Sequence, residues 1–202
     1  MQNNIRLRSY NPDITEINGD LSPNTTTFGK GYLAHIWQCM ESEGLHRAVF
    51  YDGAVRCAED LANLLAPGRA WAYCFEVHGQ VLALWWCNGH AGHMAQIHFC
   101  IFEAGRPHGH YMGMTAVRFI MKVGKCDVHG VPLSNDSAPV SVLCGVTPAP
   151  YRHAIGYATK LGFQITAALP RSCYLSPNAL GGRKHGRYVD GVLTILKRED
   201  CV

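Results

Sequence analysis

The chain has 202 residues, of which 48% are hydrophobic and 16% are charged, as expected for one globular domain over residues 1–202. Eighteen basic residues against fifteen acidic ones give a net charge of +3, which is too weak to indicate a nucleic-acid partner. Because the first residues lack the core of a signal peptide, and no apolar run approaches the roughly 18 residues of a membrane span, we expect a cytoplasmic protein without a membrane partner.

The spacing of apolar residues changes along the chain from helical periodicity to strand-like runs. Residues 30–43 have helical spacing, whereas residues 70–102 are β-branched and aromatic segments separated by hairpin-like turns. In chain order, the expected elements are a strand at 5–8, a loop at 9–29, a helix at 30–43, a helix that follows Asp52 and stops at Pro67-Gly68, strands at 70–77, 81–87 and 94–102, a helix at 111–123, a loop at 124–139, a strand at 140–146, a helix at 150–161, a strand at 163–168, a loop at 170–187 and a strand at 188–197. This order is typical of an α+β fold with a mixed sheet and a parallel crossover through 111–123.

The segment 99–111 (FCIFEAGRPHGHY) runs from an apolar strand through a loop into a predicted helix. Arg106, Gly109 and Tyr111 fall on the Arg, first Gly and last Gly/Ala positions of the pattern Q/R-x-x-G-x-G/A. A second motif, KLGF at 160–163, ends a predicted helix on a strand. The chain then ends in GRYVDGVLTILKRED.

These motifs, in this order and spacing over residues 70–197, resemble the GCN5-related N-acetyltransferase (GNAT) superfamily. The ending resembles the last strand of the branch that acetylates protein and peptide N-termini. The resemblance implies a mostly antiparallel mixed sheet flanked by helices, with splayed central strands. It also implies acetyl-CoA as co-substrate, whose pantetheine would pair with the backbone of Phe99 and Ile101.

The chemistry of the loop agrees with a pyrophosphate ligand. A turn that opens a helix offers unpaired N–H groups and a positive dipole end. Arg106 would add charge-assisted hydrogen bonds, and Gly109 would let the backbone approach closely and tolerate positive φ. The expected cofactor-binding residues are Phe99, Cys100, Ile101, Arg106, His108, Gly109, His110 and Tyr111.

Three features depart from the family pattern. Pro107 removes one N–H donor from the loop, and Tyr111 stands where a small residue is usual. In the second motif the usual Asn falls at Tyr151 and the usual general-acid Tyr falls at Ala158, beside Tyr157. Neighbouring helical positions point about 100° apart, so Tyr157 is not a simple replacement.

Candidate acid–base groups are few. His98 shares one strand face with Gln96 and Cys100 and is our first candidate for the base, with Glu103 as the alternative. A hydrogen-bonded core histidine is the competing interpretation of His98. Tyr157 is the candidate acid, because a tyrosine can protonate a thiolate.

Two Cys/His groups, 87–93 and 126–129, lack a fourth ligand at a suitable spacing, so we expect no bound metal. No two of the nine cysteines lie closer than thirteen residues, which argues against CxxC pairs and a disulfide framework. Cysteines within apolar runs are expected to pack as small hydrophobes.

The sequence leads to two functional hypotheses. The first is transfer of acetyl from acetyl-CoA to an amine, carried by a small molecule or a peptide N-terminus. The second is a GNAT-like domain that binds CoA or a protein without turnover. The loop 170–187 is expected to shape the acceptor site or to form a solvated lid. Trp85 and Trp86 are expected to pack within the sheet, and the alternative is that one of them lines the acceptor site. A homodimer is left open.

Overall fold

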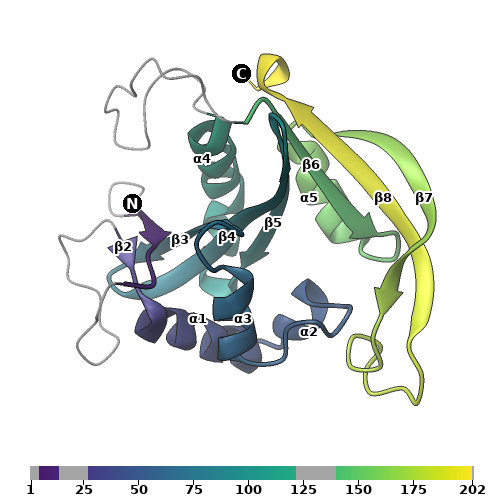
Figure 1. Cartoon of the computed structure of the whole chain (residues 1–202), viewed down its shortest axis with the longest axis horizontal. Coiled ribbons are helices and arrows are strands. Elements are labelled where there is room, and N and C mark those ends of the chain that lie inside the picture. Colours follow the sequence, from purple (N-terminus) through teal and green to yellow (C-terminus); the bar gives the residue numbers. More distant parts are fainter. Residues whose placement is uncertain (1–4, 14–26, 122–139, 202) are drawn as a thin grey trace. The chain divides into compact units, whose positions relative to one another are not determined.

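The computed structural model describes residues 5–13, 27–121 and 140–201 (Figure 1). The chain divides into two compact units that alternate along the sequence. The first comprises Met1–Asn88, His98–Pro107 and Leu175–Gly186, and the second comprises Gly89–Ile97, His108–Tyr174 and Arg187–Val202. Neither unit is therefore a contiguous segment. In the described part of the chain, no helix is long and apolar enough to cross a membrane.

Eight strands are hydrogen-bonded in the order β2-β1-β3-β4-β5-β6-β8-β7. They are β1 (Arg6–Tyr10), β2 (Thr27–Phe28), β3 (Trp71–Val77), β4 (Gln80–Ala91), β5 (Met94–Ile101), β6 (Val142–Pro148), β7 (Gln164–Leu175) and β8 (Arg187–Lys197). The pairs β1–β2 and β5–β6 are parallel, whereas β1–β3, β3–β4 and β6–β8 are antiparallel. The predicted mixed α+β sheet is thus confirmed, together with its parallel crossover.

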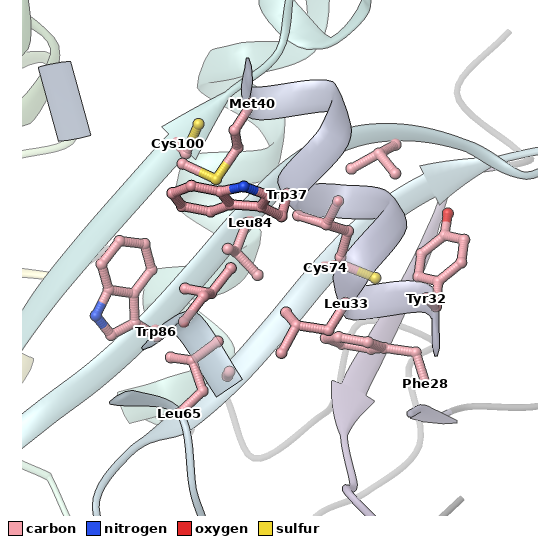
Figure 2. Packing of buried hydrophobic residues seen from close by; sticks show 14 of the residues in the cluster. Phe28, Tyr32, Leu33, Trp37, Met40, Leu65, Cys74, Leu84, Trp86 and Cys100 are labelled. Carbon is pink, nitrogen blue, oxygen red and sulfur yellow. The ribbon is translucent and has the colours of Figure 1, made fainter. Parts of the chain in front are cut away.

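The first unit has one apolar core between its helices and its strands. The helices are α1 (Lys30–Ser42), α2 (His46–Val49) and α3 (Ala58–Leu64), and α1 packs against α3. Figure 2 shows the side chains of α1 against those of β3, β4 and β5. The core includes Phe28, Leu33, Ile36, Trp37, Met40, Leu61, Cys74, Leu84, Trp86, Cys100 and Phe102.

The helix α1 forms where it was predicted, because its apolar residues recur every three to four positions and bury one face. It ends where Gly44 adopts a φ of 68°, a left-handed conformation that glycine accepts without a Cβ clash. The turn between β3 and β4 also contains residues in the left-handed backbone conformation. His78 and Gly79 have φ values of 48° and 81°, which suits a two-residue hairpin turn.

A buried ion pair joins β1 to β3. The Arg8 guanidinium donates to Glu76 Oε1 through Nε at 3.2 Å and through a terminal nitrogen at 2.8 Å, and both residues are at most 2% exposed. Glu76 Oε2 accepts the Gly79 N–H at 2.8 Å, and Tyr32 donates its hydroxyl to the Gly79 carbonyl at 3.2 Å. The carboxylate therefore fixes both the N-terminal strand and the hairpin turn.

The second unit combines the start of β5 with β6, β8 and β7 and two helices, α4 (Gly109–Met121) and α5 (Arg152–Lys160). The β6–β8 register runs over seven residue pairs, and α5 packs against β8. The parallel β5–β6 register covers Met94–Val142, Ala95–Leu143 and Gln96–Cys144.

Several elements differ from the sequence prediction. The strand β2 lies in the segment 9–29 that was predicted as a loop, and β4 continues to Ala91 instead of ending at Cys87. The short helix α2 was not predicted, and α3 begins at Ala58 rather than after Asp52. The Asp52 side chain instead accepts the N–H of Ala54 at 3.0 Å, which forms a local turn without a helix. The strand β7 continues through Leu175 and β8 begins at Arg187, so the loop predicted at 170–187 is reduced to residues 176–186. The loop expected at 124–139 lies outside the described residues.

Candidate functional site

The strand β5 presents its side chains to two different environments, as the alternation of a strand requires. Cys100 belongs to the core cluster of the first unit (Figure 2). The His98 ring stacks on Trp86, with ring centroids 4.9 Å apart and planes 6° apart. Phe99 stacks instead on Trp85 at 5.1 Å. Burial, followed by the nearby Glu43 carboxylate, raises the pKa of the Cys100 thiol, so this cysteine is a packing residue rather than a nucleophile.

His98 is held as a neutral imidazole. Its Nε2 lies 2.9 Å from Asn88 Oδ1, an oxygen that can only accept, so Nε2 carries the proton and Nδ1 the lone pair. Burial lowers the pKa of His98 to about 4. The residue is half-buried, and its ring is both hydrogen-bonded to Asn88 and stacked on Trp86.

After β5 the chain enters a 3-10 helix, η2 (Glu103–His108), which leads directly into α4. The predicted open phosphate loop is therefore wrong in its local structure. A 3-10 turn bonds its N–H groups to carbonyls three residues earlier, so these amides are used internally. Gly105 N–H donates to Phe102 O at 2.9 Å, and Glu103 N–H donates to Glu43 Oε2 at 2.7 Å.

The polar side chains of this segment remain available. Arg106 is exposed and forms no ion pair within the described residues. His108 is half-buried, and His110 and Tyr111 are exposed on the first turn of α4. Gly109 is buried as the first residue of α4, and it is not among the described glycines with positive φ, so the positive-φ explanation for this glycine does not hold.

Tyr157 fixes the start of α4 within the second unit. Its hydroxyl donates to the Gly109 carbonyl at 2.7 Å, and burial raises the pKa of this hydroxyl above its usual range. The contact depends on Gly113, because a Cβ there would clash with the Tyr157 hydroxyl and lie 2.7 and 2.8 Å from two methyl carbons of Leu161. The hydroxyl proton of Tyr157, which a general acid would donate, is therefore already hydrogen-bonded to the Gly109 carbonyl.

The second motif has the local structure that its residues predict. The helix α5 ends at Lys160, and Gly162 follows with a φ of 93°, the left-handed conformation of a helix C-terminus. Leu161 and Phe163 are buried on either side. Ala158, at the position of the family's acid, is buried and carries no hydroxyl.

Sequence reasoning missed the polar partners of these residues. Asn88 gives no local signal because it contacts His98 ten residues away, and Glu43 contacts Glu103 sixty residues away. Gly113 matters through its close approach to Tyr157 and Leu161. Across 5–13, 27–121 and 140–201, no group of three His, Cys, Asp or Glu side chains could hold a metal ion. Cys126 and His129 lie outside the described residues, so the absence of a metal stays a prediction.

No family model and no curated protein matches the chain. Solved structures do match. The spermidine N-acetyltransferase from Vibrio cholerae, in complex with CoA and spermine, has a TM-score of 0.66 and 10% identity and covers 99% of both chains. The ribosomal α-N-protein acetyltransferase RimL, in complex with coenzyme A, has a TM-score of 0.62 and 11% identity over 96% of this chain and 94% of its own.

A ribosomal-protein-alanine acetyltransferase from Vibrio fischeri also matches, with a TM-score of 0.60 and 11% identity over 86% of this chain and 91% of its own. The chain therefore has the fold of the GCN5-related N-acetyltransferases. At 10–11% identity the similarity concerns the fold.

Proposed function

We propose that the chain is an N-acetyltransferase that acts as one domain over residues 1–202 and transfers acetyl from acetyl-CoA to an amine. The observation that carries the proposal is the run from β5 through η2 into α4, which places the exposed Arg106 guanidinium just before the start of the helix. Two of the solved structures that share the fold contain CoA, which supports a cofactor site of this kind.

The cofactor phosphates would be held mainly by side chains. Pro107 has no N–H, and the N–H groups of Glu103 and Gly105 already donate to Glu43 Oε2 and to the Phe102 carbonyl. The exposed Arg106 guanidinium offers charge-assisted hydrogen bonds, and His108, His110 and Tyr111 add further donors. The backbone of 99–101 and of Gly109 completes the proposed set. The bound cofactor would supply an activated thioester.

His98 is the proposed group that receives the amine proton. As a neutral imidazole with Nδ1 unprotonated, it can accept a hydrogen bond from an amine at neutral pH. With a pKa of about 4 it is a weak base, so we propose that it orients the amine and passes the proton to water. The role of Tyr157 as the general acid stays a prediction. Its hydroxyl already donates a hydrogen bond to the Gly109 carbonyl, which competes with that role.

A non-catalytic CoA-binding domain is the second candidate. It is favoured by Ala158 and Tyr151, which replace the acid and the Asn of the family pattern, and by the engaged hydroxyl of Tyr157. Both candidates require the cofactor site, and only the first requires turnover. The cytoplasmic location and the homodimer stay predictions.

Titration calorimetry with acetyl-CoA, followed by thiol release with a panel of amines, tests the proposal. We expect binding, and we expect Arg106→Gln to weaken it by about 10- to 100-fold through the loss of charge-assisted hydrogen bonds. Arg69→Gln is the matched control, because Arg69 is also exposed but lies in the turn before β3. Absence of binding at millimolar acetyl-CoA, or equal effects of the two variants, would contradict the cofactor site. Binding without transfer to any amine would support the second candidate.

A further inference from the structure

The strands β7 and β8 expose large apolar side chains at one edge of the sheet. The strand β7 has β8 as its one neighbour in the order of the described strands (Figure 1). Within the described residues five large hydrophobic side chains are exposed, and Ile165, Tyr174 and Tyr188 on these two strands are three of them. All three belong to the second unit. Exposed aromatic residues on an edge strand are typical of a surface that binds a partner.

Arg171 in β7 is held in an unusual backbone conformation. Its φ is 51°, in the left-handed region that is unfavourable for a residue other than glycine. On β8, the Asp190 carboxylate accepts the Arg171 N–H at 2.9 Å, and Gly191 lacks the Cβ that would clash with the Ser172 hydroxyl. One left-handed residue within a strand is typical of a β-bulge, which turns a side chain in a new direction. Strain that neighbouring residues maintain in this way often marks a functional position.

This conformation places the Arg171 guanidinium over an aromatic pair. Its Cζ lies 5.8 Å from the centroid of the Tyr188 ring, and the Tyr188 and Tyr174 centroids are 5.2 Å apart. A guanidinium over a ring face keeps its N–H edges available to an acceptor. Among the residues that the structure describes, Arg171 forms no ion pair. The tyrosine–arginine surface (Arg171, Tyr174 and Tyr188) therefore presents a cation and two phenol groups to solvent.

The charge of this part of the sequence favours an acidic partner. Residues 164–197 contain five basic residues and one acidic residue, whereas the net charge of the whole chain is +3. The acidic residue is Asp190, which already accepts the Arg171 N–H. A second copy of the chain would bring the same positive charge against this surface, which is unfavourable. A carboxylate would instead pair with the guanidinium and accept hydrogen bonds from the tyrosine hydroxyls.

The position of Asp190 also favours a carboxylate over a phosphate. The Arg171 N–H, which would help the guanidinium to hold a phosphate, is occupied by the Asp190 carboxylate. That carboxylate would repel the denser charge of a nucleic-acid backbone. An extended peptide can space its carboxylates along β7, and the edge of a strand offers backbone groups to such a peptide.

We propose that the tyrosine–arginine surface docks a carboxylate-rich, extended segment of another protein along the edge of β7. Tyrosine and arginine are among the residue types that contribute most to binding energy at protein interfaces. The proposal goes beyond the proposed function, because none of the three residues belongs to the cofactor set or to the proton-transfer groups.

Fluorescence anisotropy of the full-length chain with labelled peptides tests the proposal. The peptides alternate Ala with Glu, Gln or Lys, and their N-termini are acetylated so that none can accept an acetyl group. At about 50 mM salt, we expect the Glu peptide to bind at least about tenfold more tightly than the Gln peptide. Arg171→Gln should weaken binding of the Glu peptide about tenfold through the loss of charge-assisted hydrogen bonds. Lys197→Gln is the matched control, because it removes the same charge from an exposed residue of β8 that already pairs with Glu199.

Arg171→Gly separates the side chain from the fold. Glycine accepts a φ of 51° without strain, so the urea midpoint should not fall, whereas binding of the Glu peptide should weaken as in Arg171→Gln. Absence of Glu-peptide binding, equal binding of the Glu and Gln peptides, or equal losses in Arg171→Gln and Lys197→Gln would overturn the proposal. Tighter binding of an oligouridylate of the same length would also overturn it and assign the surface to nucleic acid. The acetyl-CoA titration tests the proposed function separately.

Discussion

A Tyr157→Phe variant distinguishes an acid catalyst from a hydroxyl that positions α4. The change removes one oxygen and with it the 2.7 Å hydrogen bond to the Gly109 carbonyl. Gly109 is the first residue of α4, so its carbonyl also accepts the helical hydrogen bond from the N–H four residues later. In the variant the carbonyl therefore keeps one hydrogen-bond partner. A net hydrogen bond contributes about 0.5–1.5 kcal/mol, and with the carbonyl still bonded we expect the lower part of this range, about 0.5–1 kcal/mol of stability.

The kinetic consequence follows from the same free energy. If Tyr157 positions α4, this amount corresponds to a rise of about two- to fivefold in KM for acetyl-CoA, with kcat nearly unchanged. If Tyr157 is the acid, kcat should fall by about 10²–10⁴-fold with the cofactor affinity kept. We expect the first result. Steady-state thiol release and urea denaturation measure both quantities, and a hundredfold loss of kcat at unchanged stability would refute the reasoning.

Gly113→Ala supplies an independent check on this contact. The new Cβ would clash with the Tyr157 hydroxyl and crowd Leu161, and overpacking of this kind costs about 1–3 kcal/mol. In the Tyr157→Phe background the hydroxyl is gone, so the alanine should cost about 1 kcal/mol less than in the parent. Strictly additive effects of the two changes would show that the hydroxyl does not contact α4 at Gly113.

Two further predictions concern stability. Glu76→Gln should lower the free energy of unfolding by about 3 kcal/mol, because Arg8 would keep a buried charge without its carboxylate. The exposed pair Lys197–Glu199 is the control, and Glu199→Gln should cost less than about 1 kcal/mol in the same urea titration. The lowered pKa of His98 means that the unfolded chain binds a proton below about pH 6.5 and the folded chain only near pH 4. Stability should therefore fall by up to about 3 kcal/mol as the pH drops through this window, and a parent and a His98→Gln variant with parallel pH profiles would contradict this.

The sequence predicted most elements because their apolar periodicity agrees with the face that they bury. The helix α1 and the alternation of His98 and Cys100 on β5 are examples. The start of α3 was wrong because an Asp side chain accepts a nearby N–H equally well in a turn and at a helix cap, as Asp52 does. The end of β7 was wrong because residues 170–187 are rich in Gly, Ser, Arg and Lys and were interpreted as a loop, whereas the edge strand β7 continues to Leu175.

The order of a strand, a short connection and a helix from β5 to α4 was predictable because these elements follow one another in the sequence. The roles of Arg106 and Gly109 in cofactor binding stay predictions. The bond from Tyr157 to Gly109 spans 48 residues, and no local pattern encodes it. Similarly, the partner of His98 became evident only when β4 and β5 paired, because a histidine in a strand reveals neither its tautomer nor its neighbour.

The ion pair between Arg8 and Glu76 can form only after both residues have been synthesised. Its two residues are 68 positions apart, so β1 leaves the ribosome long before the strand that neutralises its buried arginine. At about 5–20 residues per second, the N-terminal strand waits roughly 3–14 s for Glu76 to appear. During this interval Leu7, which is buried in the folded protein, lies in an unpaired strand next to a charge that keeps it hydrated. We therefore expect the charge of Arg8 to disfavour pairing of this strand with other strand edges until β3 is made.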